Sequence, residues 1–561
     1  MFIRVKTTPN SPRRSIQICE NYRVGKKIKQ KIVHYVGIAR DDHEEGKLKN
    51  YGTELMAKIA VERAQKEAQQ SWLPLSEKDV TANIKNKKGR PARKRLEDIL
   101  PPSEVPLSDV KEESRIIEGV HEVAGVMFDE LYGTLFPKKR LMQMLKDIVL
   151  TRLVYPHSKH RTQQYLQKNF GKTHALDSIY RMMDVLFPRI GEIKKYTFEK
   201  TKSLFPEGID LLLFDVTTLY FESTEVDELR NFGYSKDHRF NTTQVVLALA
   251  TNSDGLPIGY ELFEGNKAEV STLVAAIASW KKLFTIDAVC FVGDRAMFTK
   301  QNIALLEQHQ YHYIIAAKLR KLPQPLKEKI FSEEHYRPTI FQNTLGWIGE
   351  FTHENARLIV SYKTARALKD QKEREAVLKK IEKMLGKKGA NPSKFITNQG
   401  VKRFVTKDES AQIQLDENKV TQDAQWDGLH GIITNIPGDN AESLLARYAR
   451  LWIIEESFRI NKHTLQMRPI FHWKPERIHA HIAICYMTFS VLRHLQYRVN
   501  LTQKISIDTI LDELLNVQAS IHVHKKTKDR YKLPGHFSQN AAKIYKTFGL
   551  ERSLDAAVYL E

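Results

Sequence analysis

The sequence predicts an α/β fold, because two strongly apolar segments lie within a regular succession of strands and helices. The segments IDLLLFDV (209–216) and DAVCFV (287–292) are typical of strands that are covered on both faces. Seven elements are expected here: strands at 209–216, 243–250 and 257–263, a helix at 269–283, a strand at 287–292, a helix at 299–308 and a strand at 313–317. Three strands, a helix, a strand, a helix and a strand is the order of the ribonuclease H-like fold.

The segments on either side of this core have patterns of their own. Before the core, short strands are expected at 15–18 and 28–36, followed by helical segments within 44–70 and 115–205. After it, residues 320–425 are irregular and strongly charged. Two long helices are then expected at 441–466 and 475–499, and a mixed tail follows.

The charge of the chain points to a polyanionic partner. Its 561 residues include 88 Lys and Arg against 67 Asp and Glu, a formal net charge of +21. Residues 1–100 (23 basic, 12 acidic) and 320–425 (21 basic, 14 acidic) carry 18 of these 21 excess charges. A surface that needed only solubility would spread its charge. Two basic regions around a near-neutral core therefore indicate two contacts with a nucleic-acid backbone. A role in solubility alone is the alternative.

Cysteine usage and hydropathy exclude several other classes of protein. The three cysteines, Cys19, Cys290 and Cys485, are too far apart for a disulfide framework or a CxxC metal site. The N-terminus lacks the apolar region of a signal peptide. The longest apolar stretch, 482–492, is about half of a ~20-residue membrane span. We expect a soluble, cytoplasmic protein without membrane contact.

A basic segment, NKKGRPARKR (86–95), is a candidate contact with the DNA minor groove. Its Gly-Arg-Pro centre resembles an AT-hook, in which extended arginine side chains enter a narrow minor groove. Arg90 and Arg93 would make that contact. An ordinary basic linker is the alternative.

Two aspartates are candidate metal ligands. Asp215 lies near the end of the first buried strand, and Asp294 directly follows the fourth strand. A carboxylate beside an apolar core is costly unless it is paired or binds a cation. Because the first and fourth strands of a ribonuclease H-like sheet are neighbours, both carboxylates should converge at one edge. Capping of a turn or helix by each aspartate is the alternative.

A third carboxylate is expected on the helix that includes residues 447–467. At 100° per residue, an apolar stripe faces the core, formed by Leu451, Ile454, Phe458 and Leu465. Tyr448, Glu455, Arg459 and Lys462 form a narrow polar stripe beside it. Glu455 would therefore border the core, whereas Glu456 would point to solvent. Surface ion pairing is the alternative for Glu455 and Arg459.

Three carboxylates of this kind suit two divalent cations. Mg²⁺ or Mn²⁺ takes oxygen ligands and keeps waters for a substrate phosphate. Two such ions ~3.5–4 Å apart can activate a nucleophile and stabilise the leaving oxygen in phosphoryl transfer. Asp215, Asp294 and Glu455 are thus the predicted catalytic and metal-binding residues.

These residues resemble those of bacterial insertion-sequence DDE transposases, in the branch with a Tyr-Arg-Glu-Lys signature. Tyr448, Glu455 and Lys462 match that signature in register, whereas its arginine position holds Leu451. Arg450 or Arg459 is the candidate substitute. Further similar segments are GYSKDHR (233–239), FEGNKAE (263–269), VGDRAMF (292–298), TNIPGDN (434–440) and FRINKHTLQMRPIFHW (458–473).

The resemblance implies a ribonuclease H-like core with a mainly β insertion domain between Asp294 and Glu455, which are 161 residues apart. It also implies two Mg²⁺ or Mn²⁺ ions, a homodimer in the synaptic complex, and double-stranded DNA as substrate. Relatives cleave the terminal inverted repeats of their element with metal-bound water and join the freed 3′-hydroxyl to target DNA. In some of them, an extruded base stacks on a tryptophan of the insertion.

Other candidate DNA contacts have ordinary structural alternatives. Trp347 could hold such an extruded base, as could Trp426, and packing in a core is the alternative for both. Lys236 and Arg239 could contact phosphates or lie on a solvated loop.

The predicted regions follow from these assignments. They are a basic N-terminal DNA-binding module (1–100), a helical region (101–205), the first part of the core (206–320), the insertion domain (321–425), the second part of the core with the Glu455 helix (426–500) and a C-terminal region that is a candidate for dimerisation (501–561).

The function predicted from the sequence is that of a DNA transposase. A catalytically inactive DNA-binding protein derived from a transposase is one alternative, and a nuclease of the same fold that cleaves without strand transfer is another. A tyrosine recombinase would leave the three carboxylates unexplained.

Overall fold

The computed structural model describes most of the chain after residue 104 and parts of the N-terminal region. The described residues are 1–7, 14–24, 27–39, 45–46, 48–49, 52–53, 55–56, 105–206, 208–209, 211–222, 225–233, 242–267, 269–283, 290–293, 298–341, 344–385, 399–407 and 413–559. None of the helices in these ranges is both long and apolar enough to cross a membrane.

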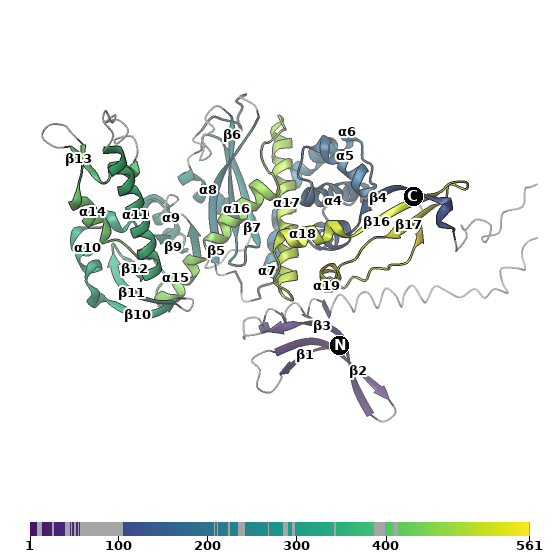
Figure 1. Cartoon of the computed structure of the whole chain (residues 1–561), viewed down its shortest axis with the longest axis horizontal. Coiled ribbons are helices and arrows are strands. Elements are labelled where there is room, and N and C mark those ends of the chain that lie inside the picture. The colour runs from purple at the N-terminus through teal and green to yellow at the C-terminus, as the bar shows by residue number, and fades with distance from the viewer. Residues whose placement is uncertain are drawn as a thin grey trace, which may run out of the picture.

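The central sheet of the fold is mixed and nine-stranded, in the order β10-β11-β12-β15-β9-β8-β5-β6-β7. In Figure 1 it runs from the left side of the molecule to its middle. Its first five strands along the chain are β5 (Leu211–Tyr220), β6 (Gln244–Thr251), β7 (Pro257–Glu264), β8 (Cys290–Gly293) and β9 (His312–Ala316). β5, β6 and β7 are antiparallel neighbours, while β5 pairs with β8 and β8 with β9 in parallel. The structure therefore confirms the mixed α/β core and the adjacency of the first and fourth strands.

Helices cover both faces of this sheet. On one face, α8 (Glu269–Leu283) and α9 (Lys300–Gln308) enclose a core with the even-numbered apolar residues of β5, such as Phe214. On the other face, α16 (Trp452–Arg459) and α17 (Pro475–Asn500) pack against the odd-numbered residues, such as Leu213. This division follows from the alternation of side chains along a strand.

The segment predicted as a mainly β insertion differs from that prediction in two ways. Its strands β10 (Tyr336–Phe341), β11 (Thr344–His353) and β12 (Ala356–Lys363) extend the central sheet, because β15 (Leu429–Thr434) pairs with both β12 and β9. The described helices of the segment also hold more residues than its strands do. These elements are α10 (Gln324–Phe331), α11 (Thr364–Leu385), α13 (Gln399–Lys402), β13 (Val405–Lys407), β14 (Ile413–Leu415) and α14 (Glu417–Ala424). When these strands join the core sheet, they form hydrogen bonds to N–H and C=O groups that would be unpaired on an edge strand.

A helical layer lies on the α17 side of the sheet and includes the C-terminal residues. Its helices are α3 (Gly125–Tyr132), α4 (Lys139–Val154), α5 (Lys159–Phe170), α6 (Leu176–Leu186), α7 (Ile190–Ser203), α18 (Ile507–Asn516) and α19 (Gln539–Thr547). A four-stranded sheet joins the segment before the core to the segment after it. Its strands are β4 (Val110–Ile117), β16 (Gln518–His524), β17 (Arg530–Pro534) and β18 (Ala557–Val558). Because β4 pairs with β16, residues on both sides of the core fold together here.

The N-terminal strands form a small separate sheet. β1 (Phe2–Thr7), β2 (Arg14–Val24) and β3 (Lys27–Ala39) are antiparallel, and their buried residues pack against Leu48 and against Leu501 after α17. The strands expected at 15–18 and 28–36 are confirmed and are longer than predicted. Figure 1 shows this sheet beside the C-terminal end of α17.

Shorter helical turns complete the fold. They lie at Leu107–Asp109, Val120–Ala124, Phe187–Arg189, Leu319–Lys321, Glu333–His335 and Ile460–Thr464. The last of these is a π-helical turn that directly follows α16. α15 (Ala441–Ala449) precedes α16.

Candidate active site

Asp215 lies in the middle of β5, on the face of the sheet that α16 covers. Side chains of odd-numbered residues of β5 point to this face, as Leu213 and Leu219 in the core on that side show. α16 packs against β5. The carboxyl is half-buried, and its Oδ1 accepts the N–H of Val216 at 2.7 Å. The sequence placed Asp215 near the end of its strand, but β5 continues to Tyr220.

The parallel pairing of β5 with β8 ends at the residue before Asp294, the second predicted aspartate. The last residues of this register are Phe214 and Gly293, which immediately precede Asp215 and Asp294 in the sequence. Asp294 itself lies outside the described residues, as do Lys236, Arg239, Arg90 and Arg93. No group of three or more metal-ligating side chains occurs among the residues that the structure does describe.

The helix expected at 441–466 is three shorter pieces. α15 ends at Ala449, α16 begins at Trp452, and the π-helical turn follows at Ile460. At the first break, the N–H of Leu451 binds the Tyr448 carbonyl at 3.0 Å, a three-residue spacing that winds the backbone more tightly than an α-helix. A constant 100° per residue therefore does not hold from Tyr448 to Lys462, and their spacing alone does not put them on one face.

Glu455 and Glu456 have different surroundings on α16. Glu455 is exposed, next to the fully buried Ile454. The expectation that Glu456 points to solvent is wrong. Its side chain is 24% exposed, and its Oε2 lies 3.3 Å from Nη1 of Arg493. The helical wheel could not predict this contact, because Arg493 comes from α17.

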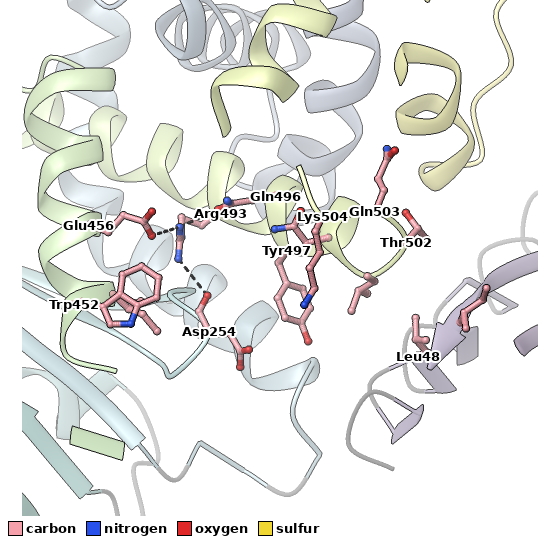
Figure 2. A pocket seen from close by; sticks show the side chains of 14 residues that line it. Leu48, Asp254, Trp452, Glu456, Arg493, Gln496, Tyr497, Thr502, Gln503 and Lys504 are labelled. Atoms are coloured by element: carbon pink, nitrogen blue, oxygen red, sulfur yellow. Dashed lines mark hydrogen bonds and ion pairs between the residues drawn. The ribbon is translucent and has the colours of Figure 1, made fainter. Parts of the chain in front are cut away.

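Arg493 links α16, α17 and the β6–β7 turn (Figure 2). Its side chain is 6% exposed. Its Nε donates to the Gly255 carbonyl at 2.9 Å, Nη2 to the Asp254 carbonyl at 3.2 Å and Nη1 to Oε1 of Gln496 at 2.9 Å. Burial lowers the pKa of Arg493, and the carboxylate of Glu456 opposes that shift. These contacts join the helix that bears Glu455 to the β6–β7 turn.

Gly255 is required at this point of the turn. Its φ of +77° is a conformation that side chains disfavour. A Cβ there would also lie 1.6 Å from Nη2 of Arg493. The sequence contained the turn signal at 253–255, but nothing in it linked that turn to an arginine on α17.

A model of the family described as "Transposase DDE domain" matches residues 206–490, just over half of the chain. The chain belongs to this family. The matched span starts just before β5 and ends within α17, so the DDE domain includes Asp215, Asp294 and Glu455.

Other comparisons add little to this assignment. No curated protein matches the chain. Among solved structures, a cryo-EM structure of the piggyBac transposase synaptic complex with hairpin DNA is similar. The similarity covers 72% of this chain and 82% of that chain, with 11% sequence identity and a TM-score of 0.35.

Within the DDE domain, the predicted DNA contacts on either side of Glu455 differ in exposure. Tyr448 is half-buried, with its ring 5.3 Å from that of His430. Arg459 is well exposed and lies 3.7 Å from Glu456, while Lys462 is half-buried in the π-helical turn. Leu451, at the arginine position of the signature, packs against the core.

Tyr448 and His430 line a cavity of about 600 Å³ with Lys363 and Arg366. Burial lowers the pKa of His430 to about 4, and the two cations add to the shift. His430 is therefore neutral near pH 7.

The two tryptophans considered as base-stacking residues both contact other aromatic rings. Trp347 on β11 is half-buried and meets Tyr362 edge-on at 5.6 Å. Trp426 meets Phe331 edge-on at 4.6 Å and belongs to the core around β12. For Trp426, these contacts agree with the packing alternative.

Proposed function

We propose that this protein is a DNA transposase that binds the ends of its element, cleaves them and joins the 3′-hydroxyl to target DNA. The observation that carries the proposal is the register of β5 and β8 inside the DDE domain. Its last pair, Phe214 and Gly293, immediately precedes the two predicted catalytic aspartates in the sequence. We further propose the branch with the Tyr-Arg-Glu-Lys signature, a bacterial source and a cytoplasmic site of action.

Asp215, Asp294 and Glu455 are proposed to hold two divalent cations, Mg²⁺ or Mn²⁺. The two described members fit such ions, because both are carboxylates, Asp215 is half-buried beside the core, and α16 packs against β5. Bound there, the ions would supply an activated nucleophile and charge stabilisation for phosphoryl transfer. The protein contributes orientation, since the contacts of Arg493 hold the helix that bears Glu455.

The proposed DNA-binding residues lie in three parts of the chain. They are Tyr448, Arg459 and Lys462 near Glu455, Lys236 and Arg239 after β5, and Arg90 and Arg93 in the N-terminal basic segment. Trp347 on β11 is a further candidate. The net charge of +21 supports contacts with a phosphate backbone. We propose a homodimer as the form that brings two element ends together.

A cleavage and joining assay tests this function. The substrate is a plasmid that carries the inverted repeats bordering the gene, with Mg²⁺ as the only divalent cation. Wild-type protein should release the element and insert it into a target, whereas Asp215→Asn and Glu455→Gln should do neither and still bind the ends. Glu476→Gln, an exposed carboxylate at the start of α17, is the matched control and should be fully active.

Two results of this assay would contradict the proposal. Cleavage without joining of precleaved ends would favour the nuclease alternative. Normal cleavage by Asp215→Asn would mean that the carboxylates are misassigned.

A further inference from the structure

A basic cavity of about 330 Å³ lies between the end of α4, the start of α5 and the residues after the π-helical turn. Three arginines and two histidines line it: Arg152, Arg161, Arg468, His157 and His481. None of its lining residues is an aspartate or a glutamate. A concave surface with cations and no carboxylate favours an anionic ligand.

Arg152 is 3% exposed and lines this cavity. Its Nη1 donates to the His157 carbonyl at 3.2 Å and its Nη2 to the Gln466 carbonyl at 2.6 Å. Its Nε has no hydrogen-bond partner among the described residues. Neutral carbonyls do not neutralise the guanidinium, so a buried positive charge remains uncompensated.

A second buried basic group, Lys159, contacts the cavity residue His481. It is 2% exposed, and its Nζ lies 3.3 Å from Nδ1 of His481. Burial and the charge of Arg152 lower the pKa of Lys159 to about 7. Asp147, earlier on α4, is already paired with Lys172 at 2.9 Å and His174 at 2.8 Å. Within the described part of the chain, no carboxylate forms an ion pair with Arg152 or Lys159.

The start of α5 strengthens the site. Ser158 caps the helix by accepting the N–H of Arg161 at 3.3 Å and lines the cavity itself. The N-terminal end of a helix carries a partial positive charge, which favours an anion.

We propose that this cavity binds a phosphate group of the DNA strand that reaches the active site. The inference rests on the proposed function. Arg468, which lines the cavity, lies over the ring of Tyr220 at 5.2 Å, and Tyr220 is the last residue of β5. Along an extended strand, Tyr220 is about 17 Å from Asp215, at ~3.3 Å per residue. The bound phosphate would thus lie a few nucleotides from the reacting one.

Phe471 indicates that the ligand is a nucleic-acid strand. This exposed ring lines the same cavity and offers a flat apolar surface beside the arginines. Bases stack on such rings regardless of sequence. A free inorganic anion has no aromatic base that could stack on this ring.

The test measures DNA binding in EDTA, where no cleavage can occur. The probe is a duplex of arbitrary sequence labelled with a fluorophore, titrated by anisotropy between about 50 and 200 mM salt. The double variant Arg161→Gln/Arg468→Gln should bind about tenfold more weakly at low salt, and the slope of log K against log salt should fall by about one. The control Arg140→Gln/Arg181→Gln removes the same charge from exposed positions on α4 and α6 and should match wild type.

Several outcomes would overturn the inference. One is an equal slope and affinity for the double variant and its control. Another is that inorganic phosphate protects wild-type protein from thermal unfolding while the double variant binds DNA as well as wild type does. The cavity would then be a site for a small anion. If the double variant does not fold, Arg161→Gln alone, an exposed change, must still weaken binding.

The proposed function can fail separately from this inference. Wild-type protein that binds DNA as described but never cleaves it in Mg²⁺ would contradict only the transposase proposal.

Discussion

Arg493 and Arg152 are equally buried but have different partners. Arg493, on α17, contacts the carboxylate of Glu456, the amide of Gln496 and two backbone carbonyls. Arg152, on α4, contacts two backbone carbonyls and has no ion pair with a described carboxylate. A buried charge whose partner belongs to the same chain serves the fold. A buried charge without one, beside a cavity, indicates a ligand.

The largest expected effect separates the two neighbouring glutamates of α16. Glu455→Gln should lower the rate of DNA cleavage at least about a thousandfold, or ~4 kcal/mol of barrier, with little loss of stability. Glu456→Gln should keep most activity but be less stable, because it weakens the pair with Arg493. Cleavage rates and urea unfolding of both variants measure this. The reverse pattern would mean that Glu456 holds the metal ions and Glu455 does not.

Replacement of each arginine by methionine tests the contrast directly. Arg493→Met should lower the free energy of unfolding by about 3 kcal/mol, because Glu456 loses its partner. Arg152→Met should stay within ~1 kcal/mol of wild type, since loss of the uncompensated charge offsets loss of two hydrogen bonds. Urea unfolding without DNA measures both. Equal destabilisation would mean that Arg152 also serves the fold.

Gly255→Ala should cost about 2–3 kcal/mol, because a Cβ there adds backbone strain and displaces the guanidinium of Arg493. Gly438→Ala is the matched control. Its φ of +80° is similar, but nothing lies within 4 Å of the added Cβ, so only the strain of ~1 kcal/mol is expected. Thermal or urea unfolding compares the two variants. Equal losses would show that contact with Arg493 contributes little.

A dependence of stability on pH is also expected, and it arises from Lys159. Its pKa is about 7 in the folded protein, below its usual value, so the unfolded chain binds more protons above pH 7. Stability should therefore rise with pH from about 7 to 10, by up to ~1.4 kcal/mol per unit, and be lowest below pH 7. Lys159→Met should remove this part of the slope.

The two histidines near Lys159 do not produce the same slope. Arg152, His472, His481 and Cys485 are the titratable or charged side chains near it. Burial lowers the pKa of His472 to about 3 and that of His481 well below its usual value, so neither gains a proton above pH 7. A slope that persists in Lys159→Met would mean that another group is responsible.

The core of the fold was predictable because its signals are local. Residues 209–216 and 287–292 are apolar enough to identify buried strands, and the order of the elements then specified their pairing. α17 was also predicted to within one residue at its C-terminal end, since its apolar stretch is long. The identity of Asp215 as a polar residue within a buried strand is likewise visible in the sequence.

The sequence by itself determined the core strands, the helix after them and the acidic residues that suggest DDE chemistry. Only the tertiary structure decided that Glu456 pairs with Arg493, 37 residues away, and that Arg152 contacts the Gln466 carbonyl, 314 residues away. It also decided where the Glu455 helix breaks and that β10–β12 extend the core sheet. Periodicity reports which face of one element is buried. It carries no information about which distant element covers that face or supplies a partner for its charges.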